Sequence, residues 1–467
     1  MNKMSLQREL SDVIDPGRLT FSPHHNPDDL RDESLHSSSA EPFAVVRPNS
    51  TDEVVAVVKI AQEYGVPVTA RGSGTGLSGA ATSLPGAIVV SFERMNAVVQ
   101  LNVNDHVVTV QPGITLRELN TAFEGTGLHY PVYPGELSGS IGGNVNTNAG
   151  GMRAVRHGVT RHHVLGLELV LANGSVIRTG GSVVKNSSGY DITQLIIGSE
   201  GTLALVTEVT LKLSPKLDHA RTVLVPYGSL EEVAVVVARL ITSGLQPSML
   251  EYLDARTMNA LANATSLELG VPPSIAEKCS SYLMIILETR TREQLEVDIV
   301  DLAGILDGSG ALDIYVLDER SAVQLIEARE RLFWVTKESG ANEIVDLVVP
   351  RSTVPAFLDE VGRIAKRHEA LIAGCGHVGD GNVHLSVYLP DDNKRERLMR
   401  EFFVYGLKLG GQISGEHGIG RDKQAHYLAL TDPALVKLQQ RIKNAFDPEK
   451  LFNPYRVSDD RVNAVEG

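Results

Sequence analysis

Three segments of this chain are so poor in bulky side chains that their backbone is ordered only if something packs against it. They are Arg71-Gly-Ser-Gly-Thr-Gly-Leu-Ser-Gly79, the segment from Tyr133 to Gly151, and Gly198-Ser-Glu-Gly-Thr-Leu-Ala204. Fixing a flexible backbone costs about 1–2 kcal/mol per residue. Glycines let backbone N–H groups approach an anion, and hydroxyl side chains add donors. The first loop alone could be a tight strand connection, but three such loops indicate a large, phosphate-bearing ligand.

The residues around the first loop predict a strand–helix–strand unit. Ala44–Val46 and 67–70 are the expected strands. The helix between them begins at the capping box Ser50-Thr-Asp-Glu53 and ends at Gly65. Further along, Asn173-Gly174 predicts a hairpin between two short strands. Ser214-Pro-Lys216 then breaks the pattern and predicts a domain boundary.

Beyond this break, two strand–helix–strand units are expected, at 221–253 and 281–316. They predict a ferredoxin-like sandwich, followed by one helix over 318–335. The fold class expected for the whole chain is therefore α+β. The expected limits are a leader at 1–36, a glycine-loop domain at 37–216, a second domain at 217–410 and a helical C-terminal segment at 411–467.

Composition narrows the function classes and the compartment. With 43 basic and 57 acidic residues, the net charge is -14, which argues against nucleic-acid binding. Cys279 and Cys375 are too few for a disulfide scaffold or a cysteine-ligated iron–sulfur cluster. We therefore expect a reducing, cytoplasmic setting. No signal peptide or spanning helix is predicted, and peripheral membrane attachment through a partner is the alternative.

The segment His377-Val-Gly-Asp-Gly-Asn-Val-His384 predicts a metal site. Asp380-Gly381 is typical of a two-residue hairpin turn, which would place His377 directly opposite His384. Opposed Cβ atoms lie roughly 4.5–5.5 Å apart, so the two imidazoles would converge on one point. Glu416 is a candidate third ligand and His417 a candidate base. The alternative is a pair of ordinary surface histidines.

Five ordered motifs together resemble a known family: Arg71–Gly79, Pro134–Gly151, Gly198–Leu203, His377–His384 and Ser414–Gly420. Over residues 40–457 the chain is similar to FAD-linked oxidoreductases of the vanillyl-alcohol oxidase/p-cresol methylhydroxylase superfamily. More narrowly, it resembles the D-lactate, glycolate and D-2-hydroxyglutarate dehydrogenases. The resemblance implies a two-subdomain FAD-binding domain, a substrate or cap domain, and a C-terminal segment that returns to the flavin.

The resemblance also implies which residues bind FAD. They are Arg71, Gly72, Ser73, Gly74, Thr75, Gly76, Leu77, Ser78, Pro134, Gly135, Ser140, Gly143, Asn144, Gly150, Gly151, Glu200, Gly201 and Val206. Some relatives attach the flavin through a histidine of the first loop. This loop contains none, so FAD is expected to be non-covalent.

The implied reaction is oxidation of a D-2-hydroxy acid to the 2-oxo acid, with hydride transfer from C2 to flavin N5. In this reading His377, His384 and Glu416 hold zinc or manganese. Arg329 binds the substrate carboxylate and His417 takes the hydroxyl proton. Hydroxyglutarate-selective relatives carry Lys and Thr where this chain has Ile344 and Phe333. A small acid such as D-lactate or glycolate is therefore expected.

Two alternatives remain open at this stage: a D-2-hydroxyglutarate dehydrogenase, and a non-catalytic flavoprotein subunit of a larger dehydrogenase. The sequence does not distinguish three classes of electron acceptor: a quinone, an electron-transfer flavoprotein and a cytochrome. The acceptor would be reached directly or through an iron–sulfur partner subunit. A homodimer is one expected assembly, by analogy with relatives.

Overall fold

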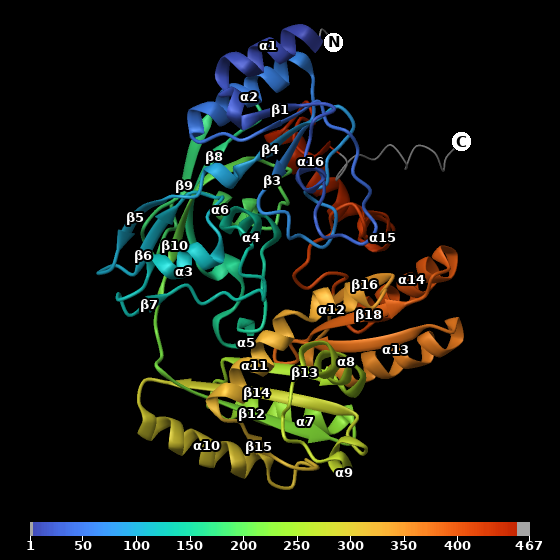
Figure 1. Cartoon of the computed structure of the whole chain (residues 1–467). Helices are drawn as coiled ribbons and strands as arrows, with labels where there is room; N and C mark the ends of the chain where they lie inside the picture. Colours follow the sequence, from blue (N-terminus) through green and yellow to red (C-terminus); the bar gives the residue numbers. More distant parts are fainter. Residues whose placement is uncertain (1–2, 455–467) are drawn as a thin grey trace.

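The structure is a computed structural model that describes residues 3–454, arranged as an upper and a lower part (Figure 1). The upper part contains the chain up to β11 together with the C-terminal helices α15 (Gln424–Leu430) and α16 (Pro433–Phe446). The lower part is built on one large sheet. Helices and sheets are segregated rather than regularly alternating, which confirms the α+β class.

The upper part contains two main sheets. The four-stranded sheet has the order β1-β2-β4-β3, with β2 (Ala44–Val46), β4 (Ile88–Ser91) and β3 (Val68–Arg71) parallel and β1 (Leu19–Phe21) antiparallel. The five-stranded sheet is antiparallel. It contains β5 (Val98–Asn102), β6 (Val107–Val110), β10 (Leu205–Lys212), β8 (Val164–Val170) and β9 (Val176–Gly180), in that order.

Local signals in the sequence set the elements of the upper part. Helix α2 (Thr51–Tyr64) begins where the Ser50 hydroxyl accepts the Glu53 N–H, and it ends at Gly65, whose φ of 62° is left-handed. Asn173-Gly174 connects β8 to β9, as predicted. Helix α1 (Lys3–Val13) buries Leu6 and Leu10 in the core beside α2.

The lower sheet has seven strands in the order β15-β12-β14-β13-β17-β18-β16. Its first four strands are β12 (His219–Tyr227), β13 (Met249–Asp254), β14 (Ser281–Thr289) and β15 (Tyr315–Val316). The order β15-β12-β14-β13, with helices after β12 and β14, is the ferredoxin-like arrangement that the sequence predicted.

The other three strands repeat the same arrangement. They are β16 (Glu343–Val348), β17 (Leu371–Gly376) and β18 (Asn382–Tyr388), with β18 between its two neighbours. A fourth strand is reduced to one antiparallel bridge between Val348 and Gln412. The lower sheet is thus two ferredoxin-like units joined edge to edge. The join consists of two cross-strand pairs between β13 and β17, Tyr252 with Gly376 and Leu253 with Cys375.

The two faces of this sheet carry different helices. One face packs its larger apolar core against α7 (Leu230–Thr242), α10 (Arg292–Leu306), α13 (Val354–His368) and α14 (Asp392–Lys408). The other face packs against α8 (Ala255–Thr265), α11 (Glu319–Glu330) and α12 (Leu332–Glu338). The single helix predicted over 318–335 is wrong, because the chain breaks at Arg331. Helices α11 and α12 lie between the two parts of the molecule (Figure 1).

No helix among residues 3–454 is long and apolar enough to cross a membrane. The elements of the structure not yet named are short. These elements are α3 (Leu116–Ala122), β7 (Leu128–His129), α4 (Ile141–Thr147), α5 (Ala154–His157), α6 (Ile192–Ile196), β11 (Ser214–Pro215) and α9 (Pro273–Ala276). Short 3-10 turns lie at Pro16–Arg18, Pro27–Leu30, Phe92–Arg94, Thr160–His162 and Arg351–Thr353.

A buried ion pair fixes the C-terminal return of the chain to the upper part. Lys443 is 3% exposed and donates to Asp447 and to the carbonyls of Thr202 and Phe452. Breaking a buried pair by removing one partner costs about 3–5 kcal/mol. We therefore expect K443M to lower the thermal stability of the upper part strongly, as measured by melting of the holoprotein. The matched variant K437M, at an exposed position of the same helix, should change it little.

Candidate functional site

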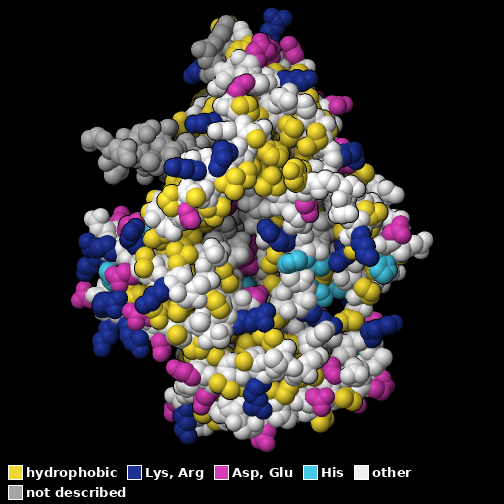
Figure 2. Space-filling model, turned by 180° about the vertical axis from the view of Figure 1, so that it is seen from behind, with side chains coloured by type: hydrophobic (Ala, Val, Ile, Leu, Met, Phe, Trp, Pro, Cys, Tyr) yellow, Lys and Arg dark blue, Asp and Glu magenta, His cyan; other side chains and the backbone are white. Residues whose placement is uncertain are grey.

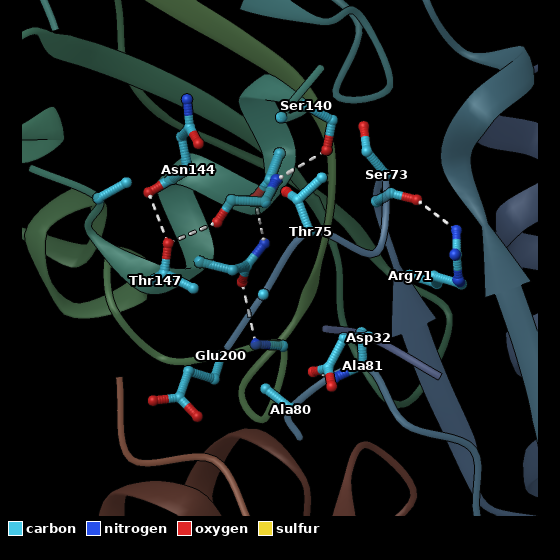
Figure 3. Close-up of a pocket in the computed structure, with 18 of the residues that line it drawn as sticks. Asp32, Arg71, Ser73, Thr75, Ala80, Ala81, Ser140, Asn144, Thr147 and Glu200 are labelled. Atoms are coloured by element: carbon cyan, nitrogen blue, oxygen red, sulfur yellow. Dashed lines mark hydrogen bonds between the residues drawn. The ribbon is translucent and has the colours of Figure 1, made fainter. Parts of the chain in front are cut away.

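The three small-residue loops line one cleft in the upper part. The empty space in this cleft, including its open mouth, is about 1240 Å³. Figure 3 shows Ser140, Asn144 and Thr147 on one side of it and Arg71 and Ser73 on the other. The lining residues that the sequence assigned to FAD are Arg71, Gly72, Ser73, Gly74, Thr75, Gly76, Leu77, Pro134, Ser140, Gly143, Asn144, Gly150, Glu200, Gly201 and Val206.

Side chains in place of two of these glycines would collide with other residues of the cleft wall. A Cβ atom at Gly72 would lie 2.2 Å from the Ser140 hydroxyl, and one at Gly150 would lie 2.7 Å from a Glu416 carboxylate oxygen. Two buried donors on its walls, Nε of Arg71 and Nδ2 of Asn144, have no hydrogen-bond partner among the described residues. Buried donors are normally paired, so these two atoms fit a polar ligand such as the phosphates and ring edges of FAD.

Three residues assigned to FAD do not line this cleft. The Ser78 hydroxyl donates to the carbonyls of His417 and Gly418, so it holds the C-terminal loop instead. Gly151 packs against the Tyr133 backbone, where a Cβ atom would lie 1.9 Å from the carbonyl oxygen. Gly135 lines the neighbouring cavity. Glu200 lines the cleft, but its carboxylate also accepts the N–H groups of Ile419 and Gly420.

A second cavity adjoins the first and lies against the seven-stranded sheet. Figure 2 shows the molecule hollowed between its upper and lower parts. The residues common to the walls of both cavities are Thr75, Leu77, Pro134, Glu136, Glu416 and His417. Arg329, His377 and His384 line only the second cavity. The predicted catalytic and metal-binding residues therefore meet at the boundary with the predicted flavin cleft.

The side chains of His377, His384 and Glu416 bring three potential metal-binding atoms close together, and we call these three residues the donor group. Nε2 of His377 lies 3.1 Å from Oε1 of Glu416 and 3.2 Å from Nε2 of His384, and the His384–Glu416 distance is 3.2 Å. A tetrahedral zinc ion with bonds of 2.0–2.1 Å needs donors about 3.3–3.4 Å apart. Although burial disfavours the imidazolium, Glu251 and Glu416 raise the pKa of His377 well above its ordinary value. The two carboxylates therefore favour positive charge at this point, either a proton on His377 or a metal ion in its place, and the three side chains are of the types that bind a divalent metal.

The two histidines meet by a different register from the one predicted. His384 is paired with Cys375 rather than with His377, so the prediction of a two-residue turn at Asp380-Gly381 is wrong. Gly381 has the positive φ that such a turn needs, but Asp380 does not. Val378 is instead buried in the sheet core and lengthens the loop. The imidazoles converge along a diagonal, with ring centroids 5.0 Å apart.

Glu251 is a site residue that the sequence analysis missed. Its fully buried carboxylate accepts Nδ1 of His377 at 2.6 Å and Nε of Arg329 at 3.1 Å. The contact crosses the join between the two ferredoxin-like units, from β13 to the end of β17. A carboxylate bound to Nδ1 fixes the orientation of the imidazole, so that Nε2 points toward Glu416 and His384. The available signal was a lone acid inside the apolar run Met249-Leu-Glu-Tyr-Leu253.

Asp346 is a second missed residue, and it shapes the loop that carries Glu416 and His417. One of its carboxylate oxygens accepts the Ser414 hydroxyl and the N–H groups of Gly415, Glu416 and His417, at 2.7–3.0 Å. The other oxygen accepts Nδ2 of Asn382. The loop thus turns around one buried anion, so its side chains are held in fixed directions.

His417 is stacked on His384, with ring centroids 5.0 Å apart and planes inclined by 13°. Burial lowers the pKa of His417 to about 4. Its imidazole is therefore unprotonated at physiological pH, as a general base must be before it acts. Arg329 also lines this cavity, is joined to His377 through Glu251, is 11% exposed, and makes no hydrogen bond through Nη1 with any described residue.

Comparison with known proteins supplies the family. Residues 216–457 match the model described as "FAD linked oxidases, C-terminal domain", and residues 42–180 match the "FAD binding domain". The chain belongs to the FAD-linked oxidases. This FAD-linked oxidase is 48% identical over 95% of its length to an uncharacterised FAD-linked oxidoreductase of Mycobacterium tuberculosis, of which it covers 97%.

Relatives with named activities place it among the D-2-hydroxy-acid dehydrogenases. It is 34% identical to a glycolate oxidase subunit of Bacillus subtilis, over 96% of this chain and 93% of the relative. It is 33% identical to the D-lactate dehydrogenase of Anaerostipes hadrus, over 95% of each chain. The solved structure of p-cresol methylhydroxylase superposes with a TM-score of 0.80 at 17% identity, covering 97% of this chain and 96% of that one. This chain therefore has the same fold as p-cresol methylhydroxylase.

Because Glu251 orients His377, its carboxylate is expected to strengthen metal binding at the donor group. We expect E251Q to keep the volume of the side chain but to weaken binding of zinc or manganese about 10–100-fold, because an uncharged amide orients His377 less well. Metal titration of the chelated protein, followed by calorimetry, measures this. A conservative change at another buried acid away from the cavities, E168Q, is the matched control. Equal affinities in E251Q and the unmodified protein would contradict this role.

Proposed function

We propose that this FAD-linked oxidase oxidises a D-2-hydroxy acid of the monocarboxylic class that includes D-lactate and glycolate. The observation that carries the proposal is the shared wall of the two cavities, where Glu416 and His417 face both the flavin cleft and the donor group of His377 and His384. Similarity to a glycolate oxidase subunit and to D-lactate dehydrogenases supports the substrate class.

Each residue of the second cavity has a distinct task in this proposal. Arg329 binds the substrate carboxylate, because a guanidinium held by Glu251 is already fixed in direction. His417 accepts the hydroxyl proton at its neutral imidazole. Glu251 and Asp346 are positioning residues, since they hold His377, Arg329 and the Ser414–His417 loop.

When bound, FAD supplies the acceptor for the hydride from C2, and a zinc or manganese ion on His377, His384 and Glu416 supplies a Lewis acid for the substrate oxygens. The first loop contains no histidine, so we propose that FAD is held without a covalent bond. Acid precipitation should therefore release all of the flavin into the supernatant.

Two alternative functions are distinguished by the same residues. Hydroxyglutarate oxidation requires a cation for the second carboxylate, and the wall beside His384 offers Ile344 and Ser386 instead. A non-catalytic flavoprotein subunit has no use for a complete donor group beside a carboxylate-binding arginine. The test is anaerobic mixing with D-lactate, L-lactate, glycolate and D-2-hydroxyglutarate while flavin absorbance is followed. Bleaching by D-lactate and glycolate is expected, whereas bleaching by D-2-hydroxyglutarate alone would overturn the proposed class.

A further inference from the structure

The second cavity extends well beyond the residues that bind the carboxylate and hydroxyl of a 2-hydroxy acid. Arg329 and the His377–His384–Glu416 group lie at one end. From His384 the wall continues along β18 to Ser386 and across to its strand partner, Ile344 on β16. Two residues of a strand span about 6.6–6.8 Å, so this extension is much longer than the methyl group of lactate.

The walls of the extension are mostly apolar and, among residues 3–454, contain no free cation. Helix α12 contributes Leu332, Phe333 and Trp334, and the sheet contributes Ile344. The polar atoms on the floor, the hydroxyls of Thr336 and Ser386, lie 3.3 Å apart and bind each other. Contact between such a surface and an uncharged, apolar group lowers the free energy of binding.

The outer rim carries an ion pair rather than an unpaired cation for a second substrate carboxylate. Glu33 lines the cavity and its carboxylate accepts the Lys337 ammonium at 2.5 Å, while Lys337 also lies over the rings of Phe333 and Trp334 at 5.7 and 5.4 Å. The Lys337 charge is therefore already neutralised. Glu33 is itself positioned by its backbone N–H, which donates to the Gly76 carbonyl of the first loop.

We propose that Leu332, Phe333, Trp334 and Ile344 form a subsite for the substrate side chain, and that the preferred substrates are monocarboxylic 2-hydroxy acids with an uncharged side chain of about four carbons. This inference rests on the proposed function and adds a preference within that class. A buried methylene improves binding roughly fourfold. D-2-hydroxycaproate, with three more methylenes than D-lactate, should therefore reduce the flavin with a kcat/KM about 60-fold higher.

The experiment has a binding arm and a reaction arm. In the binding arm, 2-oxo acids from pyruvate to 2-oxocaproate are titrated into the oxidised holoprotein, and the shift of the flavin spectrum gives Kd. In the reaction arm, D-lactate, D-2-hydroxybutyrate, D-2-hydroxycaproate and D-2-hydroxyglutarate are compared by anaerobic flavin reduction. Affinity and kcat/KM should both rise with chain length, and D-2-hydroxyglutarate should be the poorest of the longer acids.

A rim variant tests which residues create the preference. Trp334 is 38% exposed, so W334A should fold normally. It should lower the ratio of kcat/KM for D-2-hydroxycaproate to kcat/KM for D-lactate about tenfold. V323A, at an exposed position of α11, is the matched control and should keep the ratio.

The two arms separate failure of the subsite from failure of the proposed function. Equal or tighter binding of pyruvate than of 2-oxocaproate, or an unchanged ratio in W334A, would overturn the subsite while leaving 2-hydroxy-acid oxidation intact. Length-dependent binding of 2-oxo acids without flavin reduction by any 2-hydroxy acid would support the subsite and overturn the proposed reaction.

Discussion

Replacing His384 with alanine should abolish reduction of the flavin by substrate while leaving FAD bound. His384 supplies one of three donor atoms that lie 3.1–3.2 Å apart, and two donors do not retain a divalent ion at ordinary concentrations. Losing a Lewis acid that contributes about 4 kcal/mol to the transition state corresponds to a rate loss of about 10³-fold. Anaerobic stopped-flow absorbance measures the rate, and metal analysis of the same sample measures the ion.

A matched control separates the donor role from a general effect of losing a histidine. His368 on α13 is also bonded to a carboxylate, that of Glu401, but it lies outside both cavities. H368A should keep its metal content and its rate. An H384A protein that still bleaches at the unmodified rate would show that the donor group has no part in the reaction.

Replacing Arg329 with methionine should have the second large effect. The substrate carboxylate would lose its charge-assisted hydrogen bonds, each contributing about 1.5–3 kcal/mol, so kcat/KM should fall about 10³-fold with a large increase in KM. R329K keeps the charge but not the planar pair of donors, and it should recover only part of the loss. Steady-state kinetics with an artificial acceptor measure both constants. R320M, at an exposed position of the same helix, should behave like the unmodified protein.

Arg329 is also one of two partners of the buried carboxylate of Glu251, the other being His377, so R329M weakens the compensation of a buried charge and can disturb folding. The double variant E251Q/R329M removes both charges and keeps the packing. Assayed with enough zinc or manganese to saturate E251Q, it should contain FAD, give a normal circular dichroism spectrum and remain inactive. Recovery of activity in the double variant would mean that Arg329 only neutralises Glu251 and does not bind substrate.

Features set by neighbouring residues could be predicted from the sequence. The start of α2 at Ser50 and the turn at Asn173-Gly174 depend on side chains within a few positions of each other, and both predictions are confirmed. The second half of the predicted capping box differs, because the Glu53 carboxylate accepts the Asn49 N–H rather than the Ser50 N–H. The ferredoxin-like unit was also predictable, because two strand–helix–strand units in succession admit few sheet orders. Its repetition in β16, β17 and β18 was not, since the fourth strand of the second unit is one bridge.

Features that depend on distant pairing could not be predicted. Glu251 reaches His377 across 126 positions, through a join of two cross-strand pairs that nothing in either segment specifies. Asp346 likewise binds a loop about 70 residues away. The turn after His377 followed the burial of Val378 rather than the preference of Asp380-Gly381, so the two histidines converge by a register that local turn chemistry does not indicate.

The most direct test of the two-cavity reaction centre is the anaerobic rate of flavin bleaching by a D-2-hydroxy acid, measured at one FAD content before chelation, after chelation and after reloading with zinc or manganese. The structure places the donor group of His377, His384 and Glu416 beside the wall common to both cavities. We expect fast bleaching in the metal-loaded protein, loss of bleaching after chelation and its return on reloading. Equal rates in all three samples would show that flavin reduction needs no metal at His377, His384 and Glu416.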